Sequence, residues 1–152
     1  MTEVTMTNDT NLKTPWHLWV VGVIAVLFNA VGVFDFVMVM AQGAAYMESA
    51  GMTPGQIAHY QQMPAWMTAV WAIGVWGAIL ASILLLLRKK LAFPVFALSL
   101  GAFLVSLLYT YVLTDGGEVM GSEMAMANVV IIALLLFFIW YSRLMTKRGV
   151  LR

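Results

Sequence analysis

The chain has 152 residues, of which 62% are apolar and 10% are charged, and its formal net charge is +1. A soluble domain is about half apolar and about a quarter charged, and so short a chain cannot bury this much apolar surface from water. The composition therefore excludes a soluble enzyme, a nucleic-acid-binding protein and a disordered tail. The sequence contains no cysteine, which excludes disulfides, thiolate metal sites and cysteine nucleophiles.

Four segments are long and apolar enough to cross a hydrocarbon core of about 30 Å, which takes roughly 20 residues of helix. They are 16–40, 64–87, 91–113 and 124–141. Backbone groups in lipid must be satisfied within their own segment, and no strand-like alternation occurs. The predicted fold is all-α, an integral membrane four-helix bundle over 15–145, with a mobile cytoplasmic tail over 1–14 and a basic cytoplasmic tail over 146–152.

The basic residues predict the orientation of the bundle. With four spans, both termini and the 88–90 loop share one side, and that side carries all eight Lys and Arg residues. The positive-inside rule therefore predicts cytoplasmic termini in a bacterial inner (plasma) membrane. The first apolar run is longer than the roughly 7–15 residues of a signal-peptide core, so we expect a retained multi-pass protein.

The connection over 41–63 is the only long one, and we expect it to form a short helical cap on the outer side. The run from Ala44 to Ala50 has helical character and Gly51 can end it, so we expect the first helix to project past the membrane. The run from Thr53 to Gln56 has the pattern of a capping box with proline at the first helical position of a new helix. An ordinary ordered loop is the alternative.

Asp35 is the only acidic residue inside a predicted span. A carboxylate in lipid is energetically expensive and is by default a candidate functional group. The helical rise places it roughly 5–8 Å below the outer surface. The predicted ligand-binding residues of an outward-facing polar pocket are Asp35, Asn29, Tyr109, Asn128 and Ser106, with Tyr46 and Tyr60 in the roof. The alternative is that Asp35 and Asn29 only join helices by hydrogen bonds.

The sequence gives little support for a haem, metal or catalytic site. His17 and His59 lie on opposite sides of the predicted membrane, so they cannot ligate one haem iron or one metal ion. An outer divalent-cation site is an alternative without supporting ligand spacing, and its candidates are Glu48, His59, Asp115, Glu118 and Glu123. No hydrolase, metalloprotease or phosphate-binding motif occurs, so we predict no catalytic residue, metal or cofactor.

Several runs together resemble small four-span bacterial inner-membrane proteins that often carry an automatic "sugar transporter" label. The runs are Pro15–Gly22, Phe28–Asp35, Pro64–Trp66, Ala72–Gly77 and Gly117–Gly121. The resemblance covers most of the chain after residue 14. It implies membrane placement and favours transport, and it implies no catalytic residue.

These observations predict a permease-like or solute-binding membrane protein with a small polar solute as its ligand. Because four spans are few for alternating access, we expect a homo-oligomer in the lipid bilayer. The alternative is an accessory or assembly subunit of a larger membrane complex, and an enzyme is the third hypothesis.

Overall fold

The computed structural model describes residues 14–114 and 116–152, and all elements among them are helices. They are α1 (Trp16–Gln42), α2 (Ala44–Ser49), α3 (Pro54–Gln61), α4 (Ala65–Leu86), α5 (Ala92–Leu108), the π-helix η1 (Tyr109–Leu113) and α6 (Gly116–Lys147). Four of the helical stretches, α1, α4, α5 with η1, and α6, are long and apolar enough to cross a membrane. This is the architecture of a multi-pass membrane protein.

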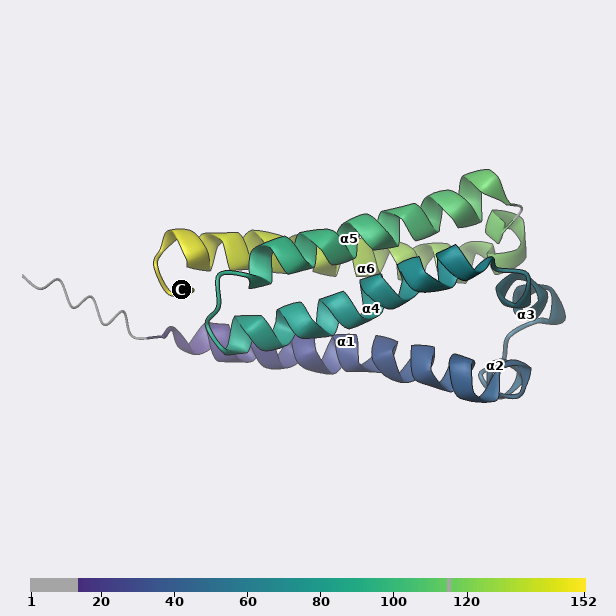
Figure 1. The fold of residues 1–152 in the computed structure, drawn as a ribbon, viewed down its shortest axis with the longest axis horizontal. Helices are drawn as coiled ribbons and strands as arrows, with labels where there is room; N and C mark the ends of the chain where they lie inside the picture. The colour runs from purple at the N-terminus through teal and green to yellow at the C-terminus, as the bar shows by residue number, and fades with distance from the viewer. Residues whose placement is uncertain (1–13, 115) are drawn as a thin grey trace, which may run out of the picture.

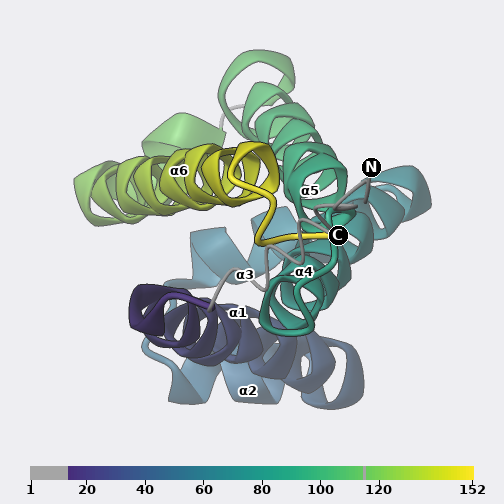
Figure 2. The ribbon, with the colours of Figure 1, turned by 90° about the vertical axis from the view of Figure 1, so that its left-hand side faces the viewer.

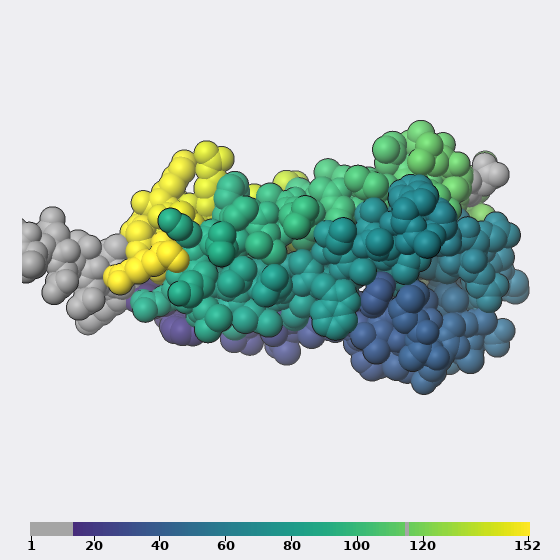
Figure 3. All heavy atoms as spheres, viewed as in Figure 1, coloured from purple at the N-terminus to yellow at the C-terminus, as the bar shows by residue number. Residues whose placement is uncertain are grey.

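The four long helices run along one axis of the molecule (Figure 1). α1 packs against α4, α4 against α5, and α5 against α6, whereas α1 and α6 are not among the well-packed pairs of the described helices. The end-on view shows the same order around the bundle (Figure 2). In the space-filling view, α4 and α5 form a continuous surface along the molecule (Figure 3). The bundle is thus tightly packed on the α4–α5 side and loosely joined between α1 and α6.

The helices converge at one end, which we call the closed end, where α1 begins and α6 finishes. Leu18 of α1, Phe96 of α5 and Phe138 of α6 are fully buried there. The Phe96 and Phe138 rings stack with their centroids 5.6 Å apart. A hydrogen bond between His17 Nδ1 and the Tyr141 hydroxyl joins α1 to α6 at this end. Side-chain packing therefore closes the bundle here, although α1 and α6 separate further along.

The residues after α6 complete the closed end. Val150 and Leu151 are buried in the same cluster of apolar side chains. The amide of Lys90 donates to the Arg152 carbonyl, and the amide of Arg152 donates to the Arg88 carbonyl. The last residues of the chain are therefore packed and hydrogen-bonded against the turn between α4 and α5.

The short helices α2 and α3 lie at the opposite end (Figure 1), which we call the α3 end. The first helix does not continue through 44–50 as expected, because Gly43 (φ 57°) ends α1 and separates it from α2. Gly51 (φ 83°) follows α2. The predicted capping box is confirmed: Thr53 Oγ1 accepts from the Gln56 amide, and the Gln56 side chain accepts from the Thr53 amide. Local sequence signals thus define where these two helices begin and end.

The fourth span differs from its predicted bounds, whereas the third, Ala92–Leu113, agrees with the predicted 91–113. α5 continues from Leu108 into η1, which places a π-helix at the α3 end. α6 begins at Gly116, is interrupted at Gly121 (φ 76°, ψ 179°), and continues to Lys147, beyond the predicted end at Tyr141. Hydropathy marks only the apolar part of a helix. Basic side chains can continue a helix past that part because their long stems reach the interface.

Candidate functional site

A cavity of about 560 Å³ lies between the four spanning helices, next to α3. Its size falls in the range of about 300–1,000 Å³ that is typical of small-molecule sites. Most of the wall is apolar, including four methionines, Met63, Met67, Met120 and Met124. The polar side chains of the wall are Asn29, Asp35, His59, Tyr60, Ser99, Ser106, Thr110 and Asn128. Sparse polar groups in an apolar wall are typical of a ligand pocket.

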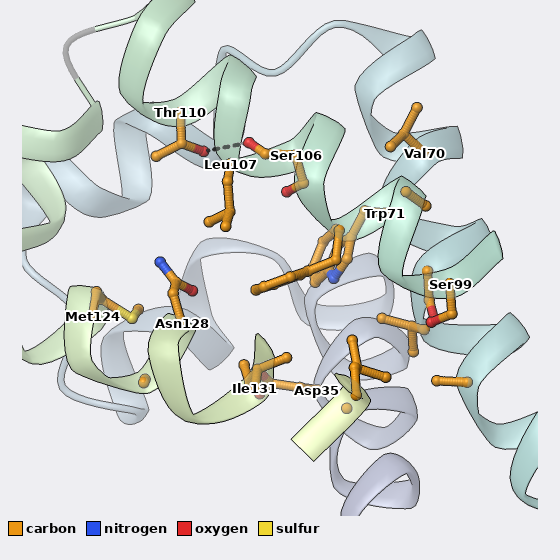
Figure 4. Close-up of a pocket in the computed structure, with 18 of the residues that line it drawn as sticks. Asp35, Val70, Trp71, Ser99, Ser106, Leu107, Thr110, Met124, Asn128 and Ile131 are labelled. Atoms are coloured by element: carbon orange, nitrogen blue, oxygen red, sulfur yellow. Dashed lines mark hydrogen bonds between the residues drawn. The ribbon is translucent and has the colours of Figure 1, made fainter. Parts of the chain in front are cut away.

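The structure brings most of the predicted ligand-binding residues together in this wall. Asp35, Asn29, Ser106, Asn128 and Tyr60 all line the cavity, and they come from α1, α5, α6 and α3. Figure 4 shows Ser106 and Asn128 on facing helices, with Asp35 on a third helix. That these residues contact a ligand stays a prediction.

Tyr46 lies outside the cavity wall but contacts one of its residues. From α2, its hydroxyl donates a hydrogen bond of 2.5 Å to Asp35 Oδ1. This hydrogen bond is the main cause that raises the pKa of Tyr46, with desolvation and the Asp35 charge adding to it. The Tyr46 hydroxyl therefore keeps its proton at neutral pH and remains a donor to the carboxylate.

Tyr109 is not among the residues that line the cavity. Its ring packs instead near Trp66 and His59, with centroids 5.6 and 6.0 Å away. The sequence predicts a polar stripe on this helix made by Ser99, Ser106 and Tyr109, with Tyr109 ten residues after Ser99. At about 100° per residue, the tenth position is turned about 80° from Ser99, whereas the eleventh returns to within about 20°.

Thr110 occupies that eleventh position and lines the cavity. Its hydroxyl donates to the Ser106 carbonyl at 3.0 Å (Figure 4). The helical spacing alone could have selected Thr110 in place of Tyr109. Sequence reasoning also missed Trp71, whose ring centroid is 4.8 Å from that of Phe36 and 5.7 Å from that of Tyr60. Trp71 lies about one helical turn before Gly74 of α4, and both residues line the cavity.

α3 is fixed to α6 beside the cavity. Gln56 Nε2 donates to the Met120 carbonyl at 3.2 Å, next to the interruption at Gly121. At Gly116, an added Cβ would approach His59 Cε1 to 2.8 Å and the Thr110 carbonyl oxygen to 2.8 Å. Glycine at 116 therefore lets the start of α6 approach α3 and η1 closely. These contacts hold His59 and Tyr60 in the cavity wall.

His59 gives this end of the protein an expected pH dependence. Burial lowers the pKa of His59 below its usual value of 6.5, so the folded protein binds its proton less readily than the unfolded chain. The free energy of unfolding is therefore expected to fall as the pH drops through 6.5 towards the lower folded-state pKa, and to lose no more below it. Unfolding titrations at several pH values measure this dependence. An equal fall of the free energy of unfolding in the His59→Gln variant would show that His59 does not cause it.

Asn29 is a buried link between α1 and α4. Its Nδ2 donates to Ser82 Oγ at 2.8 Å, and the Ser82 hydroxyl donates to the Ala78 carbonyl. Asn29 therefore has the helix-joining role that the sequence offered as an alternative, and it also borders the cavity.

Replacing Asn29 by alanine is expected to lower the free energy of unfolding by about 1 kcal/mol, the scale of an interhelical hydrogen bond in a membrane. A double-mutant cycle of Asn29→Ala with Ser82→Ala, measured by unfolding in mixed micelles, isolates this bond. Strictly additive effects of the two substitutions would show that the bond does not stabilise the bundle.

The described residues do not assemble the alternative cation site. No group of three or more His, Cys, Asp or Glu side chains suited to a metal ion occurs among residues 14–114 and 116–152. Asp115, one of the candidates, lies outside the described residues.

Comparisons with protein-family models, with curated proteins and with solved structures give no match for this chain. Its class is therefore defined by its own fold and cavity. It is an all-α, multi-pass membrane protein with a ligand-sized space between its spanning helices.

Proposed function

We propose that the chain is a solute-binding, permease-like protein of the bacterial inner membrane, which holds a small molecule in the cavity between α1, α4, α5 and α6. The observation that carries the proposal is the cavity itself, about 560 Å³ in a chain of 152 residues. Protein interiors are close-packed, and a bundle that only held its helices together would fill such a space. Its position beside α3, whose start is fixed by a capping box, favours a built site over a packing fault.

The polar groups of the wall support binding because some retain hydrogen-bonding capacity. Asn128 Nδ2 donates to the Tyr111 hydroxyl at 3.1 Å, and the Asn128 carbonyl oxygen has no hydrogen bond within the described part of the chain. Asp35 has one such partner, Tyr46. The free acceptor oxygens of Asn128 and Asp35 are therefore the groups that we propose contact a ligand.

The distribution of charge supports the proposed orientation. The basic residues of the described chain cluster at the closed end, in the 88–90 turn and from Arg143 onwards. The positive-inside rule then places the closed end in the cytoplasm and α2 and α3 outside. In this orientation the two short helices form the outer cap, and the cavity lies in the outer half of the membrane.

The oligomeric state is part of the proposal, because four spans offer few moving elements for alternating access. We propose that the protein acts as a homo-oligomer. Membership of a larger membrane complex is the alternative that the sequence left open, and the experiment below separates the two.

Native mass spectrometry of the protein, released gently from its own membrane, tests the proposed function. A homo-oligomer that retains a small-molecule adduct is the expected result. A defined assembly with other proteins would instead support the accessory role and identify the partner. A bare monomer without any adduct would contradict both.

A further inference from the structure

The cavity opens on the side of the bundle, between α1 and α6. Four of its lining residues are exposed: Val31 and Asp35 on α1, and Ala127 and Val130 on α6. Val31 is 68% exposed and Val130 is 52% exposed. On each helix the two residues lie within about one turn of each other. The two helices, α1 and α6, are not among the well-packed helix pairs of the bundle. We call these four residues the mouth.

The mouth lies at the depth of the hydrocarbon core. Measured from the middle of α1 at the helical rise, Val31 is about 3 Å and Asp35 about 9 Å towards the α3 end. Measured from the middle of α6 after its interruption at Gly121, Val130 is about 7 Å towards the same end. A core of about 30 Å extends about 15 Å from its midplane. The mouth therefore opens into the acyl chains of one leaflet.

The charge of the cavity wall favours a positively charged ligand. Among the described residues, 14–114 and 116–152, Asp35 is the only carboxylate of the wall, and no Lys or Arg lines the cavity. Burial lowers the pKa of His59, so this neighbour is neutral at pH 7. The rings of Tyr60 and Trp71 also lie in the wall, and aromatic faces attract cations. A carboxylate at this depth is expensive unless it is paired, and a cation would pair with it.

We propose that the cavity takes hydrophobic cations, such as amphiphilic amines and quaternary ammonium or phosphonium ions, and that they enter from the bilayer through the mouth. The cationic head lies at Asp35, and the apolar groups lie against Trp71 and the methionines. This inference rests on the proposed function, because it names the class of molecule that the cavity holds. A molecule of this class partitions into the leaflet where the mouth opens, which a freely water-soluble polar solute does not.

The charge preference is tested with tetraphenylphosphonium and with tetraphenylborate, an anion of nearly the same shape. The protein is placed in nanodiscs of phosphatidylcholine, and empty nanodiscs give the background. The native chain is expected to bind the cation at least about tenfold more tightly than Asp35→Asn, and not to bind the anion. Asp35→Glu keeps the charge and is expected to retain binding. Equal affinity of the native chain and Asp35→Asn for the cation would overturn the proposal.

The route is tested with a pair of introduced cysteines, which are unique because the native chain has none. In the variant with Val31→Cys and Val130→Cys, a bifunctional thiol reagent joins the two sides of the mouth. Association of tetraphenylphosphonium is expected to slow at least about tenfold after joining, and to stay unchanged in either single variant treated alike. An unchanged rate in the joined protein would overturn entry through the mouth.

The experiments can disprove the proposed ligand class and the proposed function separately. If the native protein retains a small-molecule adduct but Asp35→Asn leaves cation binding unchanged, the ligand class is wrong and the proposed function stands. If the native protein retains no adduct and binds no tetraphenylphosphonium, both are wrong.

Discussion

Gly32→Leu is expected to reduce retention of a bound molecule at least about tenfold, because the new side chain would occupy the cavity. Gly32 lines the cavity from α1, and the nearest atom to an added Cβ is Val75 Cγ1, at 4.0 Å. The backbone therefore accepts a side chain at this position, and its outer carbons extend into space that the ligand needs. Native mass spectrometry of the variant, beside the unaltered protein, measures the loss of adduct.

Gly101→Leu is the matched control for this substitution. Gly101 is exposed on α5, does not line the cavity, and an added Cβ there meets no atom within 4 Å. Both substitutions replace a helical glycine by leucine, so they change helix propensity equally. The control is expected to keep the adduct. Equal retention by the two variants would show that the bound molecule lies elsewhere.

Phe138→Ala is expected to lower the free energy of unfolding by about 2 kcal/mol. Phe138 is 1% exposed and stacks on Phe96, so its removal leaves a void at the closed end. In soluble proteins this substitution costs about 3–5 kcal/mol, which includes the transfer of the ring from water. Separated helices in a membrane keep their side chains in lipid, so only the packing part of that loss remains.

Phe137→Ala provides the comparison for this second prediction. Phe137 is the preceding residue on α6 and is 42% exposed, so its ring packs less completely. Its replacement is expected to change stability much less than Phe138→Ala. Unfolding in mixed micelles measures both. Similar losses from the two substitutions would mean that the closed end is not held by its buried aromatic pair.

Much of the fold is predictable from the sequence because its signals are local. The need for about 20 apolar residues in each span defines the four long helices. Thr53 and Gln56 lie three residues apart, so their capping box can be recognised without any tertiary contact. The end of α6 was less predictable, because basic residues such as Arg143 continue a helix without contributing to its hydropathy.

The polar residues of the candidate site could be predicted from the sequence, but the shape of the cavity could not. Asp35 and Asn29 stand out because polar groups are costly in lipid. Trp71 does not, because an aromatic residue in a span is ordinary until its neighbours are known. The side opening depends on α1 and α6 not being a well-packed pair, although a hydrogen bond joins them at the closed end, and the fit of side chains far apart in sequence decides that.

The four methionines of the cavity wall influence how strictly the cavity selects ligands by shape. A thioether side chain is flexible and polarizable, and it can adjust to apolar groups of different outline. Met63, Met67, Met120 and Met124 line the space from the α3 end and from two of the spanning helices. Such a wall adapts its outline to the molecule it holds. For the proposed ligands, selectivity therefore rests on the sign of the charge, and many differently shaped compounds compete for one site.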